Sequence, residues 1–202
     1  MAKLAEIKQE NIICAAIEIF SEKGLDQASM EAIAKKAAVS KRTLYKYYPT
    51  KESLFSVIVE RLLSSITVLS DIAFEQTQSL TEQLTSIAEK EVKLLCSSPF
   101  IALTRMVMRE CMGSKALAKV LMEKLESLES ANGMTQWIEQ GINAKQLKVE
   151  HPAIASEQFI ASLKSIIFWP QLMAHTPPPD AATQRIVINC AVQQFVAAYQ
   201  IK

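Results

Sequence analysis

Residues that begin or end helices recur at short intervals in the first quarter of the chain: Gly24, Ser29, Ser40, Pro49 and Thr50. An apolar stripe before the glycine predicts a first helix over about residues 5–23, and the glycine stops it. The two serines are expected to cap short helices over about 30–37 and 41–48, because serine hydroxyls accept hydrogen bonds from first-turn amides. The proline then ends the third helix, and the threonine caps a long helix predicted over Lys51–Phe74. Three short helices followed by a long one restrict the fold strongly.

The remaining chain is also expected to be helical. Only 4 glycines and 7 prolines occur in 202 residues, which favours long helices over many short strands. Helices are predicted over residues 80–96, 99–111, 115–129, 134–144, 152–174 and 180–200. Pro170 should kink or end the helix over residues 152–174 after Trp169. Residues 147–149 are expected to form an extended link between helices, and residues 176–179 a rigid connector. The predicted fold class is all-α.

Composition excludes several classes of protein. Half of the residues are hydrophobic, so a large core can form and general disorder is excluded. The longest uncharged run, residues 186–201, is too short and too polar to span a bilayer. Four scattered cysteines without a CxxC pair are interpreted as small core residues in a reducing compartment: Cys14, Cys96, Cys111 and Cys190. We therefore expect a cytoplasmic protein with no metal site, no cofactor and no membrane partner.

Charge is distributed unevenly, although 22 basic and 21 acidic residues give a net charge of +1. Between Ser29 and Lys51 six basic residues accompany a single acid, Glu31, so this stretch carries +5. Such a local excess is typical of a surface that meets phosphates, and the tyrosines within it supply hydroxyl donors. Two short helices joined by a tight turn match the helix-turn-helix geometry, which places its second helix in a DNA major groove. On charge alone, a solvated charged face is the alternative.

Two segments resemble the DNA-binding domain of TetR/AcrR-type transcriptional regulators: SMEAIA at residues 29–34 and AVSKRTLYKYYPTKESLF at residues 38–55. The first predicted helix, with its apolar residues and Gly24, is similar to the first helix of that family. The resemblance therefore covers about Lys8–Phe55, a quarter of the chain.

A second resemblance concerns the C-terminal part of the chain. The sequence FWP at residues 168–170, followed by PPP at residues 177–179, resembles the C-terminal region of an AefR-like subgroup of these regulators. Together the two resemblances imply a helix-turn-helix DNA-binding domain at residues 1–50. They also imply a helical effector-binding and dimerisation domain at residues 51–202.

The resemblance assigns roles to individual residues of the first domain. Side chains expected to contact backbone phosphates are Ser29, Thr43, Tyr45, Tyr47 and Lys51. Side chains expected to reach base edges, from the variable outer side of the recognition helix, are Lys41, Arg42 and Lys46. Arg42 suits a guanine, a contact worth about 1–3 kcal/mol of discrimination. Ile33, Val39 and Leu44 are expected in the core.

Three positions depart from the family pattern. Ala38 and Arg42 each stand where glycine is frequent, and Tyr48 stands where phenylalanine is usual. If the turn requires a positive φ at Ala38, alanine there costs about 1 kcal/mol. None of the three changes removes an expected phosphate ligand.

The C-terminal three quarters carry no recognisable catalytic set, so no enzyme activity is expected. An effector cavity is predicted among sulfur-containing and aromatic residues, with ordinary core packing as the alternative: Phe100, Met106, Met108, Cys111, Met134, Trp137 and Trp169. A dimer interface is predicted along the last two long helices, with burial inside a monomer as the alternative: Phe159, Leu163, Ile166, Ile167, Val192, Phe195, Val196 and Tyr199. Arg105 and Arg109, one turn apart, are interpreted as an exposed helix face, with contact to an anionic ligand as the alternative, and the run Glu89–Glu91 is interpreted as another exposed face.

Together these features predict a homodimeric repressor that binds a palindromic operator in double-stranded DNA and is released by a small, largely apolar effector. The long helix after Thr50 is expected to couple the effector site to the recognition helix. The main alternative is an all-helical small-molecule carrier or enzyme with an incidental basic surface. A lesser alternative is a constitutive regulator with a filled core. Only a regulator predicts duplex binding that weakens steeply with salt.

Overall fold

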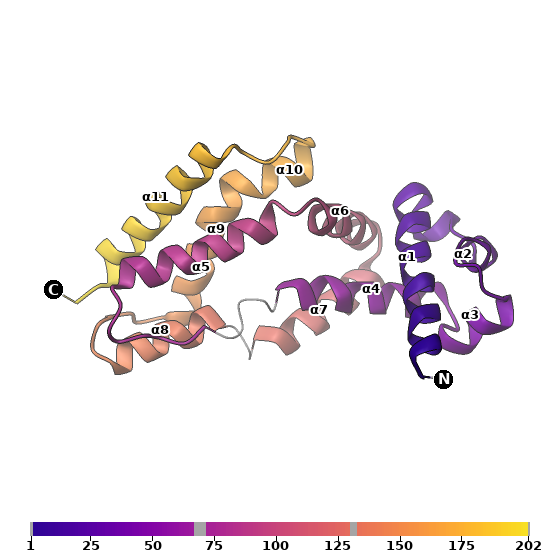
Figure 1. Cartoon of the computed structure of the whole chain (residues 1–202), viewed down its shortest axis with the longest axis horizontal. Helices are drawn as coiled ribbons and strands as arrows, with labels where there is room; N and C mark the ends of the chain where they lie inside the picture. The colour runs from indigo at the N-terminus through magenta and orange to yellow at the C-terminus, as the bar shows by residue number, and fades with distance from the viewer. Residues whose placement is uncertain (1, 67–71, 130–132, 202) are drawn as a thin grey trace. The chain divides into compact units, whose positions relative to one another are not determined.

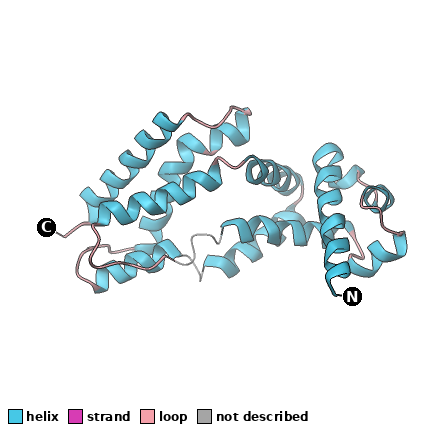
Figure 2. Ribbon diagram, viewed as in Figure 1, coloured by secondary structure: helices cyan, strands magenta, loops and turns pink. Residues whose placement is uncertain are grey.

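The computed structural model describes residues 2–66, 72–129 and 133–201. Its contacts group the chain into two compact units. The N-terminal unit comprises Met1–Ser64 with Leu103–Ser127, and the C-terminal unit comprises Ser65–Ala102 with Leu128–Lys202. Figure 2 shows that the described residues form helices joined by loops, so the predicted all-α class is confirmed. The predicted domain division between residues 50 and 51 stays a prediction.

The N-terminal unit contains the predicted succession of short helices (Figure 1): α1 (Ala2–Gln27), α2 (Met30–Lys36), α3 (Lys41–Tyr47), α4 (Lys51–Ile66), the end of α6 (Ser98–Gly113) and most of α7 (Lys115–Glu129). The three predicted caps are confirmed. In each, a hydroxyl accepts a backbone amide at 3.1 Å: Ser29 from Ala32, Ser40 from Thr43 and Thr50 from Ser53. Each cap satisfies an amide that the first helical turn leaves without a partner.

Burial holds the two short helices in place. α2 packs on α1, and α3 packs on α2. Ile33 and Leu44 are both 0% exposed and lie in the core as predicted, whereas Val39, in the turn between α2 and α3, is only half-buried. Because seven residues are too few for a stable isolated helix, α2 and α3 depend on this packing.

The fourth helix is shorter than predicted. It is described as far as Ile66, residues 67–71 lie outside the described part, and Phe74 lies outside any helix. The Phe74 amide donates to Gln140 Oε1 at 2.8 Å, and its ring lies 5.2 Å from that of Trp137, centre to centre. These contacts are made with α8 (Gly133–Asn143) and replace helical bonds, so the prediction of a helix through Phe74 is wrong.

The C-terminal unit is built around three mutually packed helices, α5 (Leu80–Leu95), α9 (Pro152–Ile167) and α11 (Ala181–Tyr199), with α8 (Gly133–Asn143) and α10 (Trp169–Ala174) against α9 (Figure 1). Ser79 and Glu82 form a capping box at the start of α5, and Asp180 caps α11. The link predicted at 147–149 is confirmed as extended chain, because the Lys148 amide donates to the Tyr199 carbonyl at 2.8 Å.

The break predicted after Trp169 occurs two residues earlier. α9 ends at Ile167, and Pro170 lies in the first turn of α10. Because first-turn amides have no partner within a helix, a proline there removes no hydrogen bond. Pro170 therefore begins a new helix and does not end the previous one, which corrects the prediction.

The cysteines are free thiols with different environments. Cys96 and Cys111 are half-buried, but Cys14 and Cys190 are exposed. The prediction that the cysteines are core residues is therefore wrong for these last two. Among the residues described, no helix is both long enough and apolar enough to cross a membrane.

The turn between α2 and α3 contains an alanine in a backbone conformation that favours glycine. Ala38 has a φ of 53°. The Val39 amide closes the turn by donating to the Ala34 carbonyl at 3.0 Å. The Ala38 side chain is exposed, so a glycine would lose little packing there. The strain considered from the sequence is therefore present, and it is worth about 1 kcal/mol.

We expect Ala38→Gly to raise the free energy of unfolding by up to about 1 kcal/mol, because the strain relieved exceeds the entropy added to the unfolded chain. Thermal unfolding followed by circular dichroism measures the change. Ala37→Gly is the matched control: Ala37 has a φ of −74° and is 5% exposed, so glycine there should destabilise the protein. An Ala38→Gly protein that melts below the wild type would contradict this account.

The C-terminal unit buries a carboxylate that the sequence analysis placed on an exposed face. Glu91 is 3% exposed, and its Oε2 accepts no hydrogen bond from the described residues. Burial raises the pKa of Glu91, the nearby Lys164 opposes this rise, and Glu157 adds to it. Helical spacing explains the burial, because Glu91 continues the stripe of buried residues through Ala88 and Leu95.

We expect Glu91→Gln to stabilise the protein at neutral pH but not in acid. The unfolded carboxyl has its ordinary pKa of 4.5, whereas the folded one is higher. Wild-type stability therefore falls as the pH rises from about 4.5 through the folded pKa, and glutamine avoids this loss. Urea unfolding over this pH range measures the difference. The exposed Glu89 supplies the control variant Glu89→Gln; equal pH dependence in both variants would refute the expectation.

Candidate nucleic-acid interface

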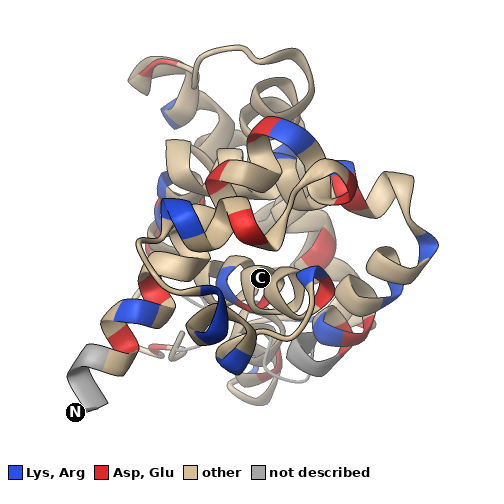
Figure 3. Cartoon of the chain, turned by 90° about the vertical axis from the view of Figure 1, so that its right-hand side faces the viewer, with Lys and Arg blue, Asp and Glu red and all other residues tan. Residues whose placement is uncertain are grey.

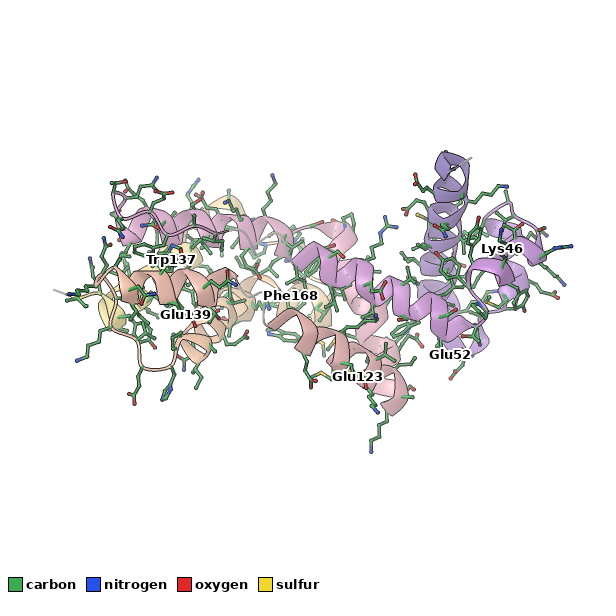
Figure 4. All side chains as sticks on the ribbon, turned by 90° about the horizontal axis from the view of Figure 1, so that it is seen from below. Lys46, Glu52, Glu123, Trp137, Glu139 and Phe168 are labelled. Atoms are coloured by element: carbon green, nitrogen blue, oxygen red, sulfur yellow. The ribbon has the colours of Figure 1, made fainter. Side chains whose placement is uncertain are left out.

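α3 has one buried side and one exposed side. Leu44 is 0% exposed and anchors the helix. Arg42 and Lys46 lie nearly half a turn from Leu44 around the helix axis and follow each other one turn apart, both exposed. Tyr45, 48% exposed, lies beside them. The exposed side of α3, on which Figure 4 labels Lys46, is therefore cationic with an aromatic border.

Ion pairs divide the basic residues around α3 into two sets. Lys36 lies 2.5 Å from Glu18 of α1, and Lys41 pairs with Glu31 of α2. Both pairs are exposed to solvent, so each contributes little to stability and can exchange partners. The other four basic residues of this stretch have no carboxylate partner among the described residues: Lys35, Arg42, Lys46 and Lys51. Lys51 bonds backbone carbonyls instead, so Lys35, Arg42 and Lys46 are the side chains available to an anion. Figure 3 colours the Lys and Arg positions of the chain blue and the Asp and Glu positions red.

Most of the side chains expected to contact phosphates already make a contact within the chain. The Ser29 hydroxyl caps α2, and Thr43 Oγ1 lies 2.8 Å from the hydroxyl that caps α3. Tyr47 is half-buried, and the Lys46 ammonium lies 5.7 Å from the centre of its ring. Tyr45 is open to solvent. Their contacts with DNA stay predictions.

Lys51 has a role that the sequence did not indicate. Its ammonium donates to the carbonyls of Leu25, at 2.7 Å, and Asp26, at 3.0 Å, near the end of α1. Two of its three N–H donors are therefore used inside the protein. The side chain joins the start of α4 to the end of α1, and a phosphate contact would involve only the remaining donor.

We expect Lys51→Met to lower the free energy of unfolding by about 1–2 kcal/mol, because it removes two hydrogen bonds from a charged donor at a half-buried position. Chemical denaturation measures this loss. The exposed Lys35 supplies the control variant Lys35→Met, which should change stability by less than about 0.5 kcal/mol. The outcome that would contradict this role is a Lys51→Met protein of unchanged stability whose slope of log K for DNA binding against log salt concentration is reduced by about 0.9. Lys51 would then be a phosphate ligand.

Arg109 is not simply part of an exposed helix face. It donates to backbone carbonyls near the end of α1, including that of Ser21 at 3.1 Å, and the adjacent Glu110 accepts the Leu25 amide at 3.1 Å. The interpretation from sequence was therefore incomplete. No local pattern could have found these contacts, because 85 residues separate Leu25 from Glu110.

The residues predicted to line an effector cavity belong to both units: Met106, Met108 and Cys111 to the N-terminal unit, and Phe100, Met134, Trp137 and Trp169 to the C-terminal unit. Trp137, labelled in Figure 4, is 0% exposed and donates to Gln83 Oε1 at 3.0 Å. Gln83 in turn bonds the backbone of Glu75 and Gln78, so Trp137 belongs to a structural network. Trp169 is 45% exposed, and the effector cavity stays a prediction.

Most residues predicted at the dimer interface are buried by their own chain: Phe159, Leu163, Ile167, Val192 and Phe195. Leu163 and Ile167 are 0% exposed, so they have no surface left to bury against a second copy, and the dimer interface itself stays a prediction. Of the others, Ile166 is 51% exposed, while Val196 and Tyr199 are half-buried.

An open groove of about 200 Å³ lies between α9 and α11. Phe159, Phe195 and Tyr199 line it together with small and amide side chains. Three of the predicted interface residues thus reach a surface through this groove. Elsewhere in the described chain, no group of three or more acidic, histidine or cysteine side chains is arranged to hold a metal ion.

Comparison with known proteins identifies the class that this fold and this cationic helix define. Residues 12–58 match the family described as "Bacterial regulatory proteins, tetR family", and residues 82–201 match "AefR-like transcriptional repressor, C-terminal domain". The arrangement is that of a helix-turn-helix regulator with a helical C-terminal domain. The chain belongs to the TetR family and carries an AefR-like C-terminal domain, so both resemblances stated from the sequence are confirmed.

Curated relatives match part of the chain. The "Uncharacterized HTH-type transcriptional regulator YvdT" of Bacillus subtilis (strain 168) is 37% identical over 113 residues, which cover 48% of this chain and 55% of that protein. The "HTH-type transcriptional regulator UidR" of Escherichia coli (strain K12) is 46% identical over 55 residues, 27% of this chain and 28% of the relative. The chain thus spans about half, or less, of the length of these relatives.

Solved structures match nearly the whole chain. A TetR family transcriptional regulator from Pseudomonas syringae pv. tomato str. DC3000 is 31% identical with a TM-score of 0.84, covering 96% of this chain and 97% of that one. The "Flavonoid-responsive Regulator FrrA" is 27% identical with a TM-score of 0.76, covering 96% and 98% respectively. The fold of the whole chain is therefore that of TetR-family regulators.

Proposed function

We propose that the chain is a DNA-binding transcriptional repressor that acts as a homodimer on a palindromic operator and is released by a small, largely apolar effector. The observation that carries the proposal is the cationic exposed side of α3, held outward by the burial of Leu44. Membership of the TetR family supports the same class. Neither a carrier nor an enzyme requires an exposed cationic side on α3. The predicted cytoplasmic location is part of the proposal, since it would bring the protein to DNA.

Within this proposal, α3 enters the major groove. Arg42 presents two parallel donors to a guanine edge, and Lys46 lies one turn farther along the same side. Lys41 exchanges Glu31 for a phosphate or a base, because that pair is exposed. Tyr45, Tyr47, Ser29 and Thr43 supply hydroxyl donors to the backbone, which positions the helix without reading sequence.

The proposal requires two copies of the chain. A seven-residue recognition helix reaches few base pairs, so specific binding needs a second helix about 34 Å away on a two-fold axis. The surface of α9 and α11 fits a second copy, because besides the open groove between them these helices carry the exposed Ile166 and Ile186, 51% and 63% exposed. A sedimentation mass twice that of the 22.5 kDa chain is expected.

The effector part of the proposal concerns the C-terminal unit. FrrA, similar in fold along its whole length, is described as flavonoid-responsive, which supports a small aromatic or apolar effector here. Such a ligand shifts the protein toward a state with wrongly spaced recognition helices only by binding that state more tightly. α4, which follows the helix-turn-helix directly in the chain, is the proposed link between ligand and DNA.

Binding of the full-length protein to the duplex immediately upstream of its gene tests the proposal. We expect binding whose log K falls linearly with log salt concentration. Footprinting on that duplex should show a palindrome, and Arg42→Ala should lose about 1–3 kcal/mol of preference at one base pair of each half-site.

The control is Lys119→Ala, which removes an equal charge from the exposed surface of α7. It should bind like the wild type. A purified protein that is monomeric and does not bind the duplex at low salt would overturn the proposal.

A further inference from the structure

The regular hydrogen bonding of α1 is interrupted at Gly24. This residue has φ 79° and ψ 162°, outside the helical range, and the helix then continues to Gln27. In an uninterrupted helix the Leu25 amide would donate to the Ser21 carbonyl. The ψ of Gly24 turns that amide away, so the break leaves both a donor and an acceptor without their helical partners.

Two consecutive residues of α6 bond to both of these groups. Arg109 Nη1 donates to the Ser21 carbonyl at 3.1 Å, and Glu110 Oε2 accepts the Leu25 amide at 3.1 Å. Arg109 Nη2 also donates to the Phe20 carbonyl. The arginine and the glutamate therefore take the places of the donor and the acceptor that α1 lost.

The two side chains also hold each other. Glu110 Oε1 lies 3.0 Å from Nε and 2.9 Å from Nη2 of Arg109, so the second carboxylate oxygen stays free for Leu25. The Glu110 side chain is only 11% exposed, whereas that of Arg109 is 47% exposed. Little water reaches the Glu110 carboxylate, and a charge-assisted hydrogen bond is stronger where water is largely excluded.

The segment after the break leads directly to the DNA-binding helices. Lys51 holds the Leu25 and Asp26 carbonyls from α4, so residues 25 and 26 are bonded on two sides. Ser29, the cap of α2, follows three residues after Asp26. The direction in which α2 and α3 leave α1 thus depends on how this short segment is fixed.

We propose that Arg109 and Glu110 are positioning residues for DNA binding, which replace the helical hydrogen bond missing at Gly24 and so fix the orientation of α2 and α3. Neither residue touches DNA in this role. The inference rests on the proposed function, because fixing the orientation of α2 and α3 matters only if it raises the fraction of protein molecules that are ready to bind DNA. When that fraction falls, the apparent dissociation constant rises in proportion.

The test uses the full-length protein, the duplex upstream of its gene, and the variants Arg109→Met, Arg109→Lys, Glu110→Ala and Glu110→Gln. We expect Arg109→Met and Glu110→Ala to weaken binding about tenfold. Arg109→Lys retains a cationic donor and Glu110→Gln retains an acceptor oxygen, so each should show a smaller loss than Arg109→Met or Glu110→Ala. Lys119→Met, an exposed lysine on α7 of the same unit, is the matched control and should bind like the wild type.

Two further measurements separate positioning from other roles. The slope of log K against log salt should be unchanged in every variant, whereas loss of a phosphate contact would reduce it by about 0.9. Hydrogen exchange of a peptide covering residues 21–28 should become faster in Arg109→Met and Glu110→Ala and stay unchanged in Lys119→Met. Circular dichroism establishes that each variant is folded. If Arg109→Met does not fold, Arg109→Lys and Glu110→Gln decide the question.

Variants that bind and exchange like the wild type would overturn the inference, and so would a reduced salt slope. A wild type that fails to bind the duplex would instead overturn the proposed function. In that case the exchange of residues 21–28 still shows whether Arg109 and Glu110 hold the break.

Discussion

Everything that the N-terminal unit presents outward depends on the burial of one leucine. α3 contains seven residues, fewer than an isolated helix needs in water, and Leu44 is its fully buried position. With Leu44 inside, helical geometry leaves Arg42 and Lys46 on the opposite side. The same constraint applies to α2, which is also seven residues long and has Ile33 at its centre. The helix-turn-helix therefore acts as one packed body, and its surface chemistry follows from its core.

Local patterns in the sequence predict the part of the fold that local interactions determine. The serine and threonine caps are found where they were predicted, because a cap involves residues only three apart. The positive φ of Ala38 was anticipated only from the resemblance to TetR/AcrR-type regulators, which implied a frequent glycine there. The α4 end was wrong because Phe74 is held by Gln140 and Trp137, residues far away in the sequence. Tertiary contacts of this kind leave no local signal.

The candidate site shows the same division. The cationic side of α3 could be predicted from charge and helical spacing, but the partners of individual cations could not. Lys51 donates to the Asp26 carbonyl, 25 residues away in the sequence. Arg109 donates to the Ser21 carbonyl, 88 residues away. In the C-terminal unit, apolar positions along two helices could not tell an internal face from an external one. Leu163 and Ile167 proved internal, whereas Ile166 between them proved exposed.

The contact between Lys46 and Tyr47 has a consequence for the thermodynamics of recognition. A lysine side chain has about 2 kcal/mol of rotamer entropy to lose when it is immobilised. Because the Lys46 ammonium already rests 5.7 Å from the centre of the Tyr47 ring, part of that disorder is removed before any nucleic acid arrives. Arg42, one turn earlier and without such a neighbouring ring among the described residues, keeps its full freedom until it is bound. Two cations on the same side of one helix thus differ in preorganisation.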